Sequence, residues 1–482
     1  MLNSSWQARA TRASAPAAFA PVTVVGAGFS GTMMAAQLAR MQINCFLVEE
    51  HSCKTGAGAA YSTAEASHLL NARAEAMSAW PDKPDDFAAE WRDYGRSEDA
   101  FAPRFVYRRY LQTILDKAVE SRRTYVLRGA ATAARKRGDV WSVQLADGTA
   151  IESQHLVLAT GNEAPRRPSW SDRVVHNFIG DPWSLEAQAA IVEAAMLHRD
   201  VLIIGTGLTM LDVALSLESA GRRGRIVAVS RNGLVPYGHA SAPTDFNFEV
   251  PASGSLLEIS NHLRANAAHH DWRSAVDSLR PHIQTLWQQL SITDKRRFLR
   301  HARPWWGVHR HRIAPAIAAR IDNMRETGHL EVIAGRVAEA EPDNGRACIR
   351  IRLRGTEEYD ERSFGTIFNC AGPLDTLLET RNPILDQLLR DREIEPDELG
   401  IGVAVDSVSR AKGHLNLWAA GALTKGTFLE ITAVPELRIQ VANIATSIAS
   451  ELGQSRTVRR DPAPSFRVSD SSDQAAILPP LN

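Results

Sequence analysis

The chain has 482 residues, of which 44% are hydrophobic and 23% are charged, proportions that are ordinary for a globular protein. Its 55 Lys and Arg residues balance 55 Asp and Glu residues, so a nucleic-acid partner held by excess positive charge is not expected. The length suggests about three structural units. No run approaches the roughly 18 apolar residues that a membrane span requires.

The cysteine pattern indicates a reducing compartment. Cys45, Cys53, Cys348 and Cys370 form no CxxC pair, which disfavours a zinc ribbon and a redox-active dithiol. Three of them, Cys45, Cys348 and Cys370, stand in apolar strand-like runs and are predicted to be small buried hydrophobes. We therefore expect a cytoplasmic protein. Residues 1–20 lack a continuous apolar segment and are predicted to be a disordered leader, with organelle targeting as the alternative.

Ordered structure is expected to begin near Pro21 with a β-branched strand over 21–25, a glycine turn, a helix to Arg40 and a second strand over 45–48. In such a βαβ unit the first glycine permits the turn, the second lets amides approach a pyrophosphate, and the third lets the helix pack on the sheet. A carboxylate after the second strand accepts hydrogen bonds from ribose hydroxyls. The pattern predicts a dinucleotide site, with a turn that only packs as the alternative. Its residues are Gly26, Ala27, Gly28, Phe29, Ser30, Gly31 and Glu49.

A second unit of the same kind begins about 180 residues later. We predict helices within 85–120, an edge strand at 140–145 and a strand at 155–159, then a strand at 201–204, a helix to about 220 and a strand at 225–229. Met210 replaces the third glycine, so looser helix packing is expected. The second strand ends in Ser230 and Arg231 instead of an acid, which favours NADPH over NADH unless Arg231 is merely solvated. The predicted contacts are Gly205, Thr206, Gly207, Leu208, Thr209, Ser230 and Arg231.

Two further strand ends, at 156–162 and 367–373, bracket the second unit and offer places where the chain crosses between domains. Their predicted cofactor contacts are Thr160, Gly161 and Gly372. Residues 255–330 are predicted to form a helical insertion, and strands return at 330–355, 366–370 and 415–420 before a last helix over 435–452. The resulting fold is α/β with two Rossmann-like dinucleotide-binding domains, the first of them discontinuous. The predicted boundaries are 1–20 leader, 21–162 first domain, 163–365 second domain, 366–452 return to the first domain, and 453–482 disordered tail.

The sequence resembles two-dinucleotide-binding flavoproteins such as the flavin-containing and N-hydroxylating monooxygenases, and more closely the bacterial YdhS-like FAD/NAD(P)-binding proteins. The matching segments include GAGFSG at 26–31, GAGAAYST at 56–63, HLLNARAEAMSAWP at 68–81, FAPRFVYRRY at 101–110, LATGN at 158–162, GTGLTMLDVALSL at 205–217, VSRNG at 229–233, DWRSAVDSLRP at 271–281, VHRHRIAP at 308–315 and TAVPELRIQVANIA at 432–445. The resemblance implies FAD in the first domain, a nicotinamide donor in the second, and oxidoreductase or monooxygenase activity. A urate-hydroxylating branch is similar in type.

Some residues depart from this pattern or carry two interpretations. Many such flavoproteins have Gly-Asp at a third FAD contact, where this chain has Gly421 and Ala422. We expect backbone amides near Gly421 and Gly426 to hold the ribityl chain instead. Asn71 either approaches the flavin or caps a loop, and Arg104 and Tyr107 either face a cofactor or pack.

The run from His309 to Arg312, beside Trp305 and Trp306, either contacts an anionic substrate or nicotinamide phosphates, or is structural. No carboxylate completes a metal triad near it, so no metal is expected.

The predicted function is a FAD-dependent, NAD(P)H-using oxidoreductase, and most specifically a monooxygenase that uses O2 to hydroxylate a small molecule such as urate or a similar heterocycle. The alternatives are a FAD-binding redox sensor or scaffold, and an NAD(P)H oxidase or reductase. Because the cofactor carries the chemistry, the sequence assigns no catalytic side chain, and it assigns no oligomeric state. The insertion at 255–330 is the predicted lid and substrate selector.

Overall fold

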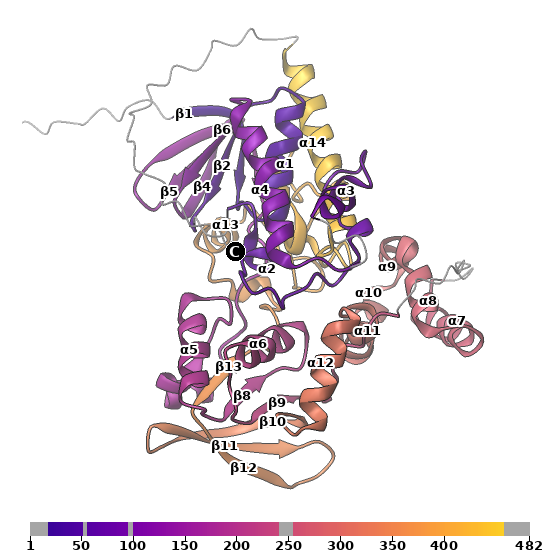
Figure 1. The fold of residues 1–482 in the computed structure, drawn as a ribbon. Coiled ribbons are helices and arrows are strands. Elements are labelled where there is room, and N and C mark those ends of the chain that lie inside the picture. Colours follow the sequence, from indigo (N-terminus) through magenta and orange to yellow (C-terminus); the bar gives the residue numbers. More distant parts are fainter. Residues whose placement is uncertain (1–17, 52–54, 95–99, 241–253, 457–482) are drawn as a thin grey trace, which may run out of the picture.

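The computed structural model describes residues 18–51, 55–94, 100–240 and 254–456, which form two domains, each built on its own sheet (Figure 1). The first sheet has the strand order β3-β2-β1-β6-β5-β4, and β14 pairs with the second half of β6. Its strands are β1 (Ala18–Val25), β2 (Cys45–Glu49), β3 (Thr124–Arg128), β4 (Ala131–Arg137), β5 (Val140–Leu145), β6 (Ala150–Leu158) and β14 (Leu417–Ala419). The strand expected at an edge, β5, instead lies between β4 and β6, because residues 131–137 add a hairpin outside it.

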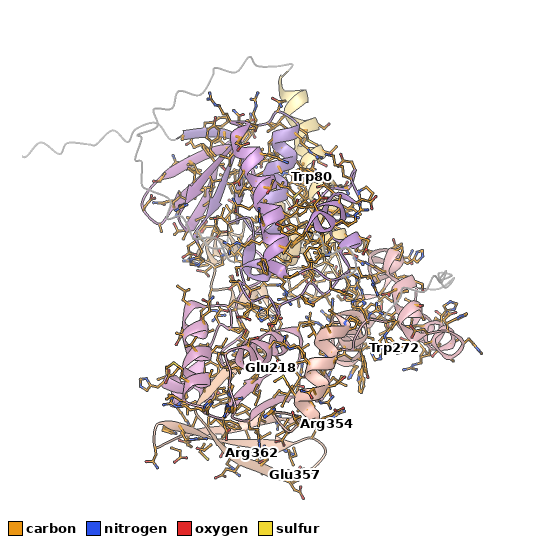
Figure 2. All side chains as sticks on the ribbon, in the orientation of Figure 1. Trp80, Glu218, Trp272, Arg354, Glu357 and Arg362 are labelled. Carbon is orange, nitrogen blue, oxygen red and sulfur yellow. The ribbon has the colours of Figure 1, made fainter. Side chains whose placement is uncertain are left out.

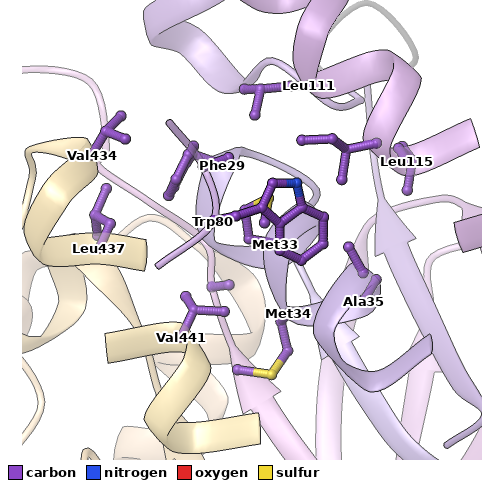
Figure 3. Close-up of a cluster of buried hydrophobic side chains, with 14 of the residues drawn as sticks. Phe29, Met33, Met34, Ala35, Trp80, Leu111, Leu115, Val434, Leu437 and Val441 are labelled. Carbon is purple, nitrogen blue, oxygen red and sulfur yellow. The ribbon is translucent and has the colours of Figure 1, made fainter. Parts of the chain in front are cut away.

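One face of this sheet is covered by α1 (Phe29–Arg40), α4 (Arg104–Glu120) and α14 (Val434–Arg456), and α13 (Pro383–Arg390) packs with the core of the other face. Figure 3 shows Trp80 among apolar side chains of α1, α4 and α14. The guanidinium carbon of Arg40 lies 3.2 Å from the Trp80 ring centroid. This core fixes the starts of α1 and α14 relative to each other. Two short helices, α2 (Gly58–Tyr61) and α3 (Asp86–Asp93), complete the domain.

The second sheet has the order β12-β11-β10-β9-β8-β13-β7. Its strands are β7 (Phe178–Ile179), β8 (Val201–Ile204), β9 (Ile226–Ser230), β10 (Leu330–Asp343), β11 (Arg346–Leu353), β12 (Tyr359–Phe364) and β13 (Thr366–Asn369). The predicted boundary at 366 is corrected, because β13 pairs in parallel with β8 and β7 and so completes the second sheet. The chain therefore returns to the first domain only after Asn369.

The second sheet packs with α5 (Leu185–Met196), α6 (Leu208–Ser219) and α12 (Pro315–Glu326). Because Ile317, Ile321 and Met324 of α12 lie in that domain's core, the predicted helical insertion ends earlier than 330. The insertion proper comprises α7 (Leu256–His269), α8 (Trp272–Ser278), α9 (Ile283–Gln289), α10 (Ile292–Arg297) and α11 (Arg303–Arg310). Figure 1 shows α7, α8 and α9 to one side of both sheets.

Several smaller expectations are also resolved by the structure. Cys45 and Cys370 are buried as predicted, but Cys348 is only half-buried, because it sits on the outer hairpin, where its thiol contacts Glu361. The predicted leader (1–20) and tail (453–482) both extend too far into the ordered chain, since β1 begins at Ala18 and α14 continues to Arg456. The rest of both segments, and Cys53, lie outside the described residues. Within the described part of the chain, no helix is both long and apolar enough to cross a membrane.

Candidate functional site

The first glycine turn joins β1 to α1 and is packed against the end of β6. A Cβ atom on Gly26 would lie 2.4 Å from the Ala159 carbonyl oxygen, and one on Gly31 would lie 1.7 Å from the Gly26 carbonyl oxygen. The amide of Ala159 donates to the Val25 carbonyl over 2.8 Å, which fixes this strand end beside the turn. Gly26 and Gly31 are therefore required by the protein's own backbone.

Gly28, by contrast, leaves room for a ligand. A Cβ there would meet only the Gly58 Cα, at 3.6 Å. No side chain caps α1, so its first backbone N–H groups remain available to an anion. One carboxylate oxygen of Glu49 accepts from the Ala27 amide over 2.8 Å, which holds the acid at the turn. These residues fit the pyrophosphate and ribose of an adenine dinucleotide.

The second glycine turn, between β8 and α6, repeats this geometry. A Cβ on Gly205 would lie 2.2 Å from the Cys370 carbonyl oxygen at the end of β13, whereas Gly207 has no atom within 4 Å of its added Cβ. No side chain caps α6. Met210, at the position of the missing third glycine, is fully buried in the domain core. This turn also fits a dinucleotide.

The end of β9, which is followed by Arg231, lies beside this turn. The Ser230 hydroxyl is already bonded to Thr206 Oγ1 at 2.8 Å and accepts from the Gly233 amide at 3.0 Å, so its observed role is to shape the turn. Arg231 is exposed and has no ion pair among the described residues. Ala334 of β10 pairs with Ser230, and the Arg354 amide donates to the Ala334 carbonyl over 2.9 Å. Sequence reasoning missed Arg354, whose backbone is one strand away from Ser230 through Ala334. Figure 2 shows Arg354 among the side chains of the second domain.

A cleft of about 480 Å³ lies between the two domains. It unites residues that were predicted separately, because Asn71, Leu208, Thr209 and Gly372 all line it. Tyr61 and Trp183 contribute aromatic surface. Residues of both domains, including two that directly follow the second glycine turn, therefore share one space, as a two-cofactor site requires.

Other predicted contacts lie near the first turn. Thr160 and Gly161 follow β6, and the Thr160 Cα would be 3.1 Å from a Cβ on Gly26. Gly421 abuts Ser30 Oγ, which a Cβ on Gly421 would approach to 2.9 Å. The expectation that the Gly421 amide faces the ribityl chain is corrected, because this amide donates to Gln440 Oε1 over 2.8 Å.

The place of a Gly-Asp pair is thus filled by a polar network around Gln440, whose amide nitrogen donates to Ser409 and Thr424. The Gly426 region is also occupied by protein. A Cβ on Gly426 would lie 2.0 Å from Asp397 Oδ2, and the Gly426 carbonyl accepts from the Trp287 indole over 2.9 Å.

A buried polar cluster joins the domains at the cleft. Arg104 on α4 pairs with Asp212 on α6, with Nη1 and Oδ2 2.8 Å apart and each side chain 8% exposed. His68 Nε2 lies 2.9 Å from the Asp212 carbonyl and 3.0 Å from Ser216 Oγ. Burial lowers the pKa of His68 and so favours the neutral ring. An acid inside the apolar sequence of α6 was the signal that could have revealed this cluster.

The insertion forms a charged wall against the start of α14. Arg280 makes a two-point contact with Glu436, at 2.8 and 3.1 Å, and His311 Nε2 lies 3.3 Å from Glu430 Oε2. Burial acts to raise the pKa of Glu430, but His311 and Arg310 outweigh it and lower the pKa to about 2. Arg280, Arg310 and His311 line the cleft.

The remaining members of the basic run point elsewhere. His309 bonds to the Trp305 carbonyl and packs against Trp272, and Arg312 pairs with Asp277. Tyr107 is fully buried in the first domain's core. Among the described residues, no group of three or more His, Cys, Asp or Glu side chains is arranged to hold a metal ion.

Comparison with known proteins supports this architecture. Residues 23–163 match a family described as FAD-NAD(P)-binding. No curated protein matches the chain. Several solved structures align with TM-scores of 0.63, among them two with FAD bound. The ornithine N-hydroxylase of Kutzneria sp. 744, with reduced FAD, NADP+ and L-ornithine, is 15% identical, over 90% of this chain and 100% of that one. The FAD-bound cadaverine monooxygenase of Erwinia amylovora is 12% identical, over 95% and 100%.

Thioredoxin reductase of T. acidophilum aligns at a TM-score of 0.52 and 12% identity, over 90% of this chain and 99% of that one. At these identities the similarity establishes a two-domain α/β fold with parallel Rossmann-like sheets. Because monooxygenases and a reductase share it, the fold alone does not select the reaction.

Proposed function

We propose that the protein is a FAD-dependent NAD(P)H oxidoreductase that acts as a monooxygenase on a small molecule. The observation that carries this proposal is the repeated geometry of the two glycine turns. Each turn abuts a strand-end carbonyl through its first glycine, each opens an uncapped helix, and residues of both halves line one cleft. The match of residues 23–163 to a FAD-NAD(P)-binding family supports FAD at the first turn.

FAD and NADPH, when bound, would supply hydride transfer and oxygen activation. The protein's residues supply binding and enclosure. The first amides of α1 hold phosphate, Glu49 orients the ribose, and the amides of α6 hold the second pyrophosphate. Arg231 with Arg354 binds a 2′-phosphate, which makes NADPH the preferred donor. Tyr61 and Trp183 help to exclude water from the cleft.

The substrate is proposed to be urate or a similar heterocycle, on the strength of the YdhS-like segments and the urate-hydroxylating branch that resembles them. The solved neighbours act on ornithine and cadaverine, which extends the candidates to amines. The half-buried and buried free cysteines suit the cytoplasm, which we propose as the location.

The test is a spectroscopic titration of the purified protein. A yellow protein that anaerobic NADPH bleaches within seconds is expected, and a substrate from a panel of purines, aromatic acids and amines should stimulate NADPH oxidation without equivalent peroxide. Bleaching with stoichiometric peroxide throughout the panel would indicate an oxidase. A yellow protein that NADPH does not reduce would indicate a sensor or scaffold, and a colourless protein that refuses FAD would refute the proposal.

A further inference from the structure

In the charged wall formed by Arg280, Arg310, His311, Glu430 and Glu436, the basic side chains face the cleft and the acids lie behind them. Arg280, Arg310 and His311 are among the lining residues, whereas the acids that face them, Glu430 and Glu436, are not among the described residues that line it. The glutamates are also the more buried partners of Arg280 and His311, with Glu436 15% and Glu430 7% exposed. The cleft is therefore lined by two guanidinium groups and an imidazole ring, and the two carboxylates lie behind them.

Arg310 shares the two glutamates with Arg280 and His311 and makes a hydrogen bond to neither. Its side chain is 10% exposed, and its nitrogens lie 3.8 Å from Glu430 Oε2 and 3.9 Å from Glu436 Oε1, distances longer than hydrogen bonds. Within the described structure, its Nε and Nη2 atoms are fully buried on the side of the two glutamates and make no hydrogen bond, so only the rest of the guanidinium can face the cleft. Arg280, by contrast, is satisfied by both oxygens of Glu436. A guanidinium so placed gains from an additional negative charge in the cleft.

The N-terminal end of α14 adds positive electrostatic potential to the cleft. Residues 432–435 line the cleft, and α14 begins at Val434 and runs to Arg456, so its positive end points to this space. Each acid that lines the cleft has a hydrogen-bond partner, and Asp212 is also neutralised by an arginine. Asp212 pairs with Arg104, Glu163 accepts from the Arg381 amide over 2.7 Å, and Asp181 accepts from the Trp183 amide over 2.9 Å.

We propose that Arg310, supported by Arg280 and His311, binds the anionic group of the substrate. This inference rests on the proposed function, because it takes the cleft as the substrate site, and it deepens it by naming the substrate class. The substrate is a small organic anion, such as a carboxylate or an ionised heterocycle, and among amines those that also carry an anionic group are favoured over an aliphatic diamine, which offers this wall no negative charge.

The experiment is isothermal titration calorimetry on the FAD-loaded protein with matched pairs of probes, in which one member carries the anion and the other lacks it. The pairs are benzoate with benzamide, L-lysine with cadaverine, and urate with hypoxanthine. In at least one pair the anion should bind at least about tenfold more tightly. If no pair shows this preference, including the case in which neither member binds, the inference is overturned without need of any variant.

Variants then assign the preference to Arg310. Arg310→Met should abolish it, and Arg310→Lys should retain part of it, because charge is kept while the planar fork is lost. Arg320→Met is the matched control, because Arg320 pairs with Glu218 on α6 and does not line the cleft. A preference that survives Arg310→Met overturns the inference, and so does displacement of the bound anion by NADP+, which would assign the wall to the coenzyme.

The same samples separate this inference from the proposed function. A yellow protein that NADPH bleaches but that lacks the anion preference overturns the inference alone. A colourless protein that refuses FAD overturns the proposed function, on which the inference rests.

Discussion

Arg104 and Asp212 form a buried ion pair that crosses from one dinucleotide-binding domain to the other, with 2.8 Å between Nη1 and Oδ2. The pair is reinforced from the backbone, since Arg104 Nε donates to the Leu69 carbonyl over 3.1 Å and His68 reaches the Asp212 carbonyl over 2.9 Å. Both side chains line the cleft. The contact therefore fixes the separation of the two glycine turns at the place where the proposed cofactors meet.

Asp212→Ala should destabilise the protein by about 3–5 kcal/mol, because it leaves the Arg104 guanidinium buried without a counter-charge. Urea unfolding monitored by tryptophan fluorescence measures the loss. In samples that still bind FAD, we also expect slower flavin reduction at saturating NADPH, since the turns lose a fixed separation.

Glu218→Gln is the control on the same helix. It removes the pair with Arg320, whose side chains are 36% and 35% exposed, so the expected cost is at most about 1 kcal/mol. Equal destabilisation by Asp212→Ala and Glu218→Gln would contradict the importance given to burial of the interdomain pair.

Alanine substitutions in the two glycine turns should weaken the binding of FAD and of NADPH separately. Gly28→Ala and Gly207→Ala place a methyl group where the protein has room, so the fold should persist. The methyl group instead meets the pyrophosphate, so Gly28→Ala should weaken FAD and Gly207→Ala should weaken NADPH, each by about tenfold or more. Bound flavin absorbance and NADPH saturation curves measure the two effects.

Gly31→Ala is the contrasting variant, because its Cβ would lie 1.7 Å from the Gly26 carbonyl oxygen. It should impair folding itself and lower the soluble yield. If Gly207→Ala lost FAD while retaining NADPH affinity, the assignment of the two turns would be reversed.

Arg231→Ala and Arg354→Ala should each raise the KM for NADPH about tenfold and leave that for NADH nearly unchanged, because only NADPH carries the 2′-phosphate. Steady-state kinetics with both donors measure the difference. Arg350→Ala is a control on the same hairpin, since Arg350 is already paired with Glu339. Equal losses for NADPH and NADH would show that neither arginine reads the phosphate.

Local signals in the sequence were sufficient for the two βαβ units, because a glycine turn between a β-branched strand and an apolar helix is encoded within about thirty residues. The same reasoning placed residues 366–370 in the first domain, since a short apolar strand carries no mark of the sheet that it joins. That membership depends on pairing with β8, far away in the chain. The extent of the insertion was misjudged for the same reason, because α12 is distinguished from α11 only by the core that it enters.

The candidate site likewise combines features that the local sequence predicts with features that only contacts between distant segments create. Glu49 follows its glycine turn at the spacing expected for this motif, and the structure places it at the turn. The backbone of Arg354 is placed one strand away from the end of β9 only by the register of the neighbouring strands, which no local pattern encodes. In place of the expected Gly-Asp pair, Gln440 from another element bonds to the Gly421 amide. The sequence could show that the acid is missing, but it could not show which side chain takes its place.

The buried His155 should give the protein an acid-sensitive stability. Burial, with a smaller contribution from Arg410, lowers the pKa of His155 from 6.5 to about 4. Between these values the unfolded chain takes up a proton that the folded protein does not, so stability falls as the pH drops from 6.5 towards 4. The full effect is limited to about 3 kcal/mol. His155→Gln, which keeps an acceptor near the Trp418 indole, should flatten the dependence of the unfolding free energy on pH in this window, as measured by urea titrations at several pH values. The exposed His176→Gln should retain the wild-type slope, and an unchanged slope in His155→Gln would show that the buried ring does not titrate as inferred.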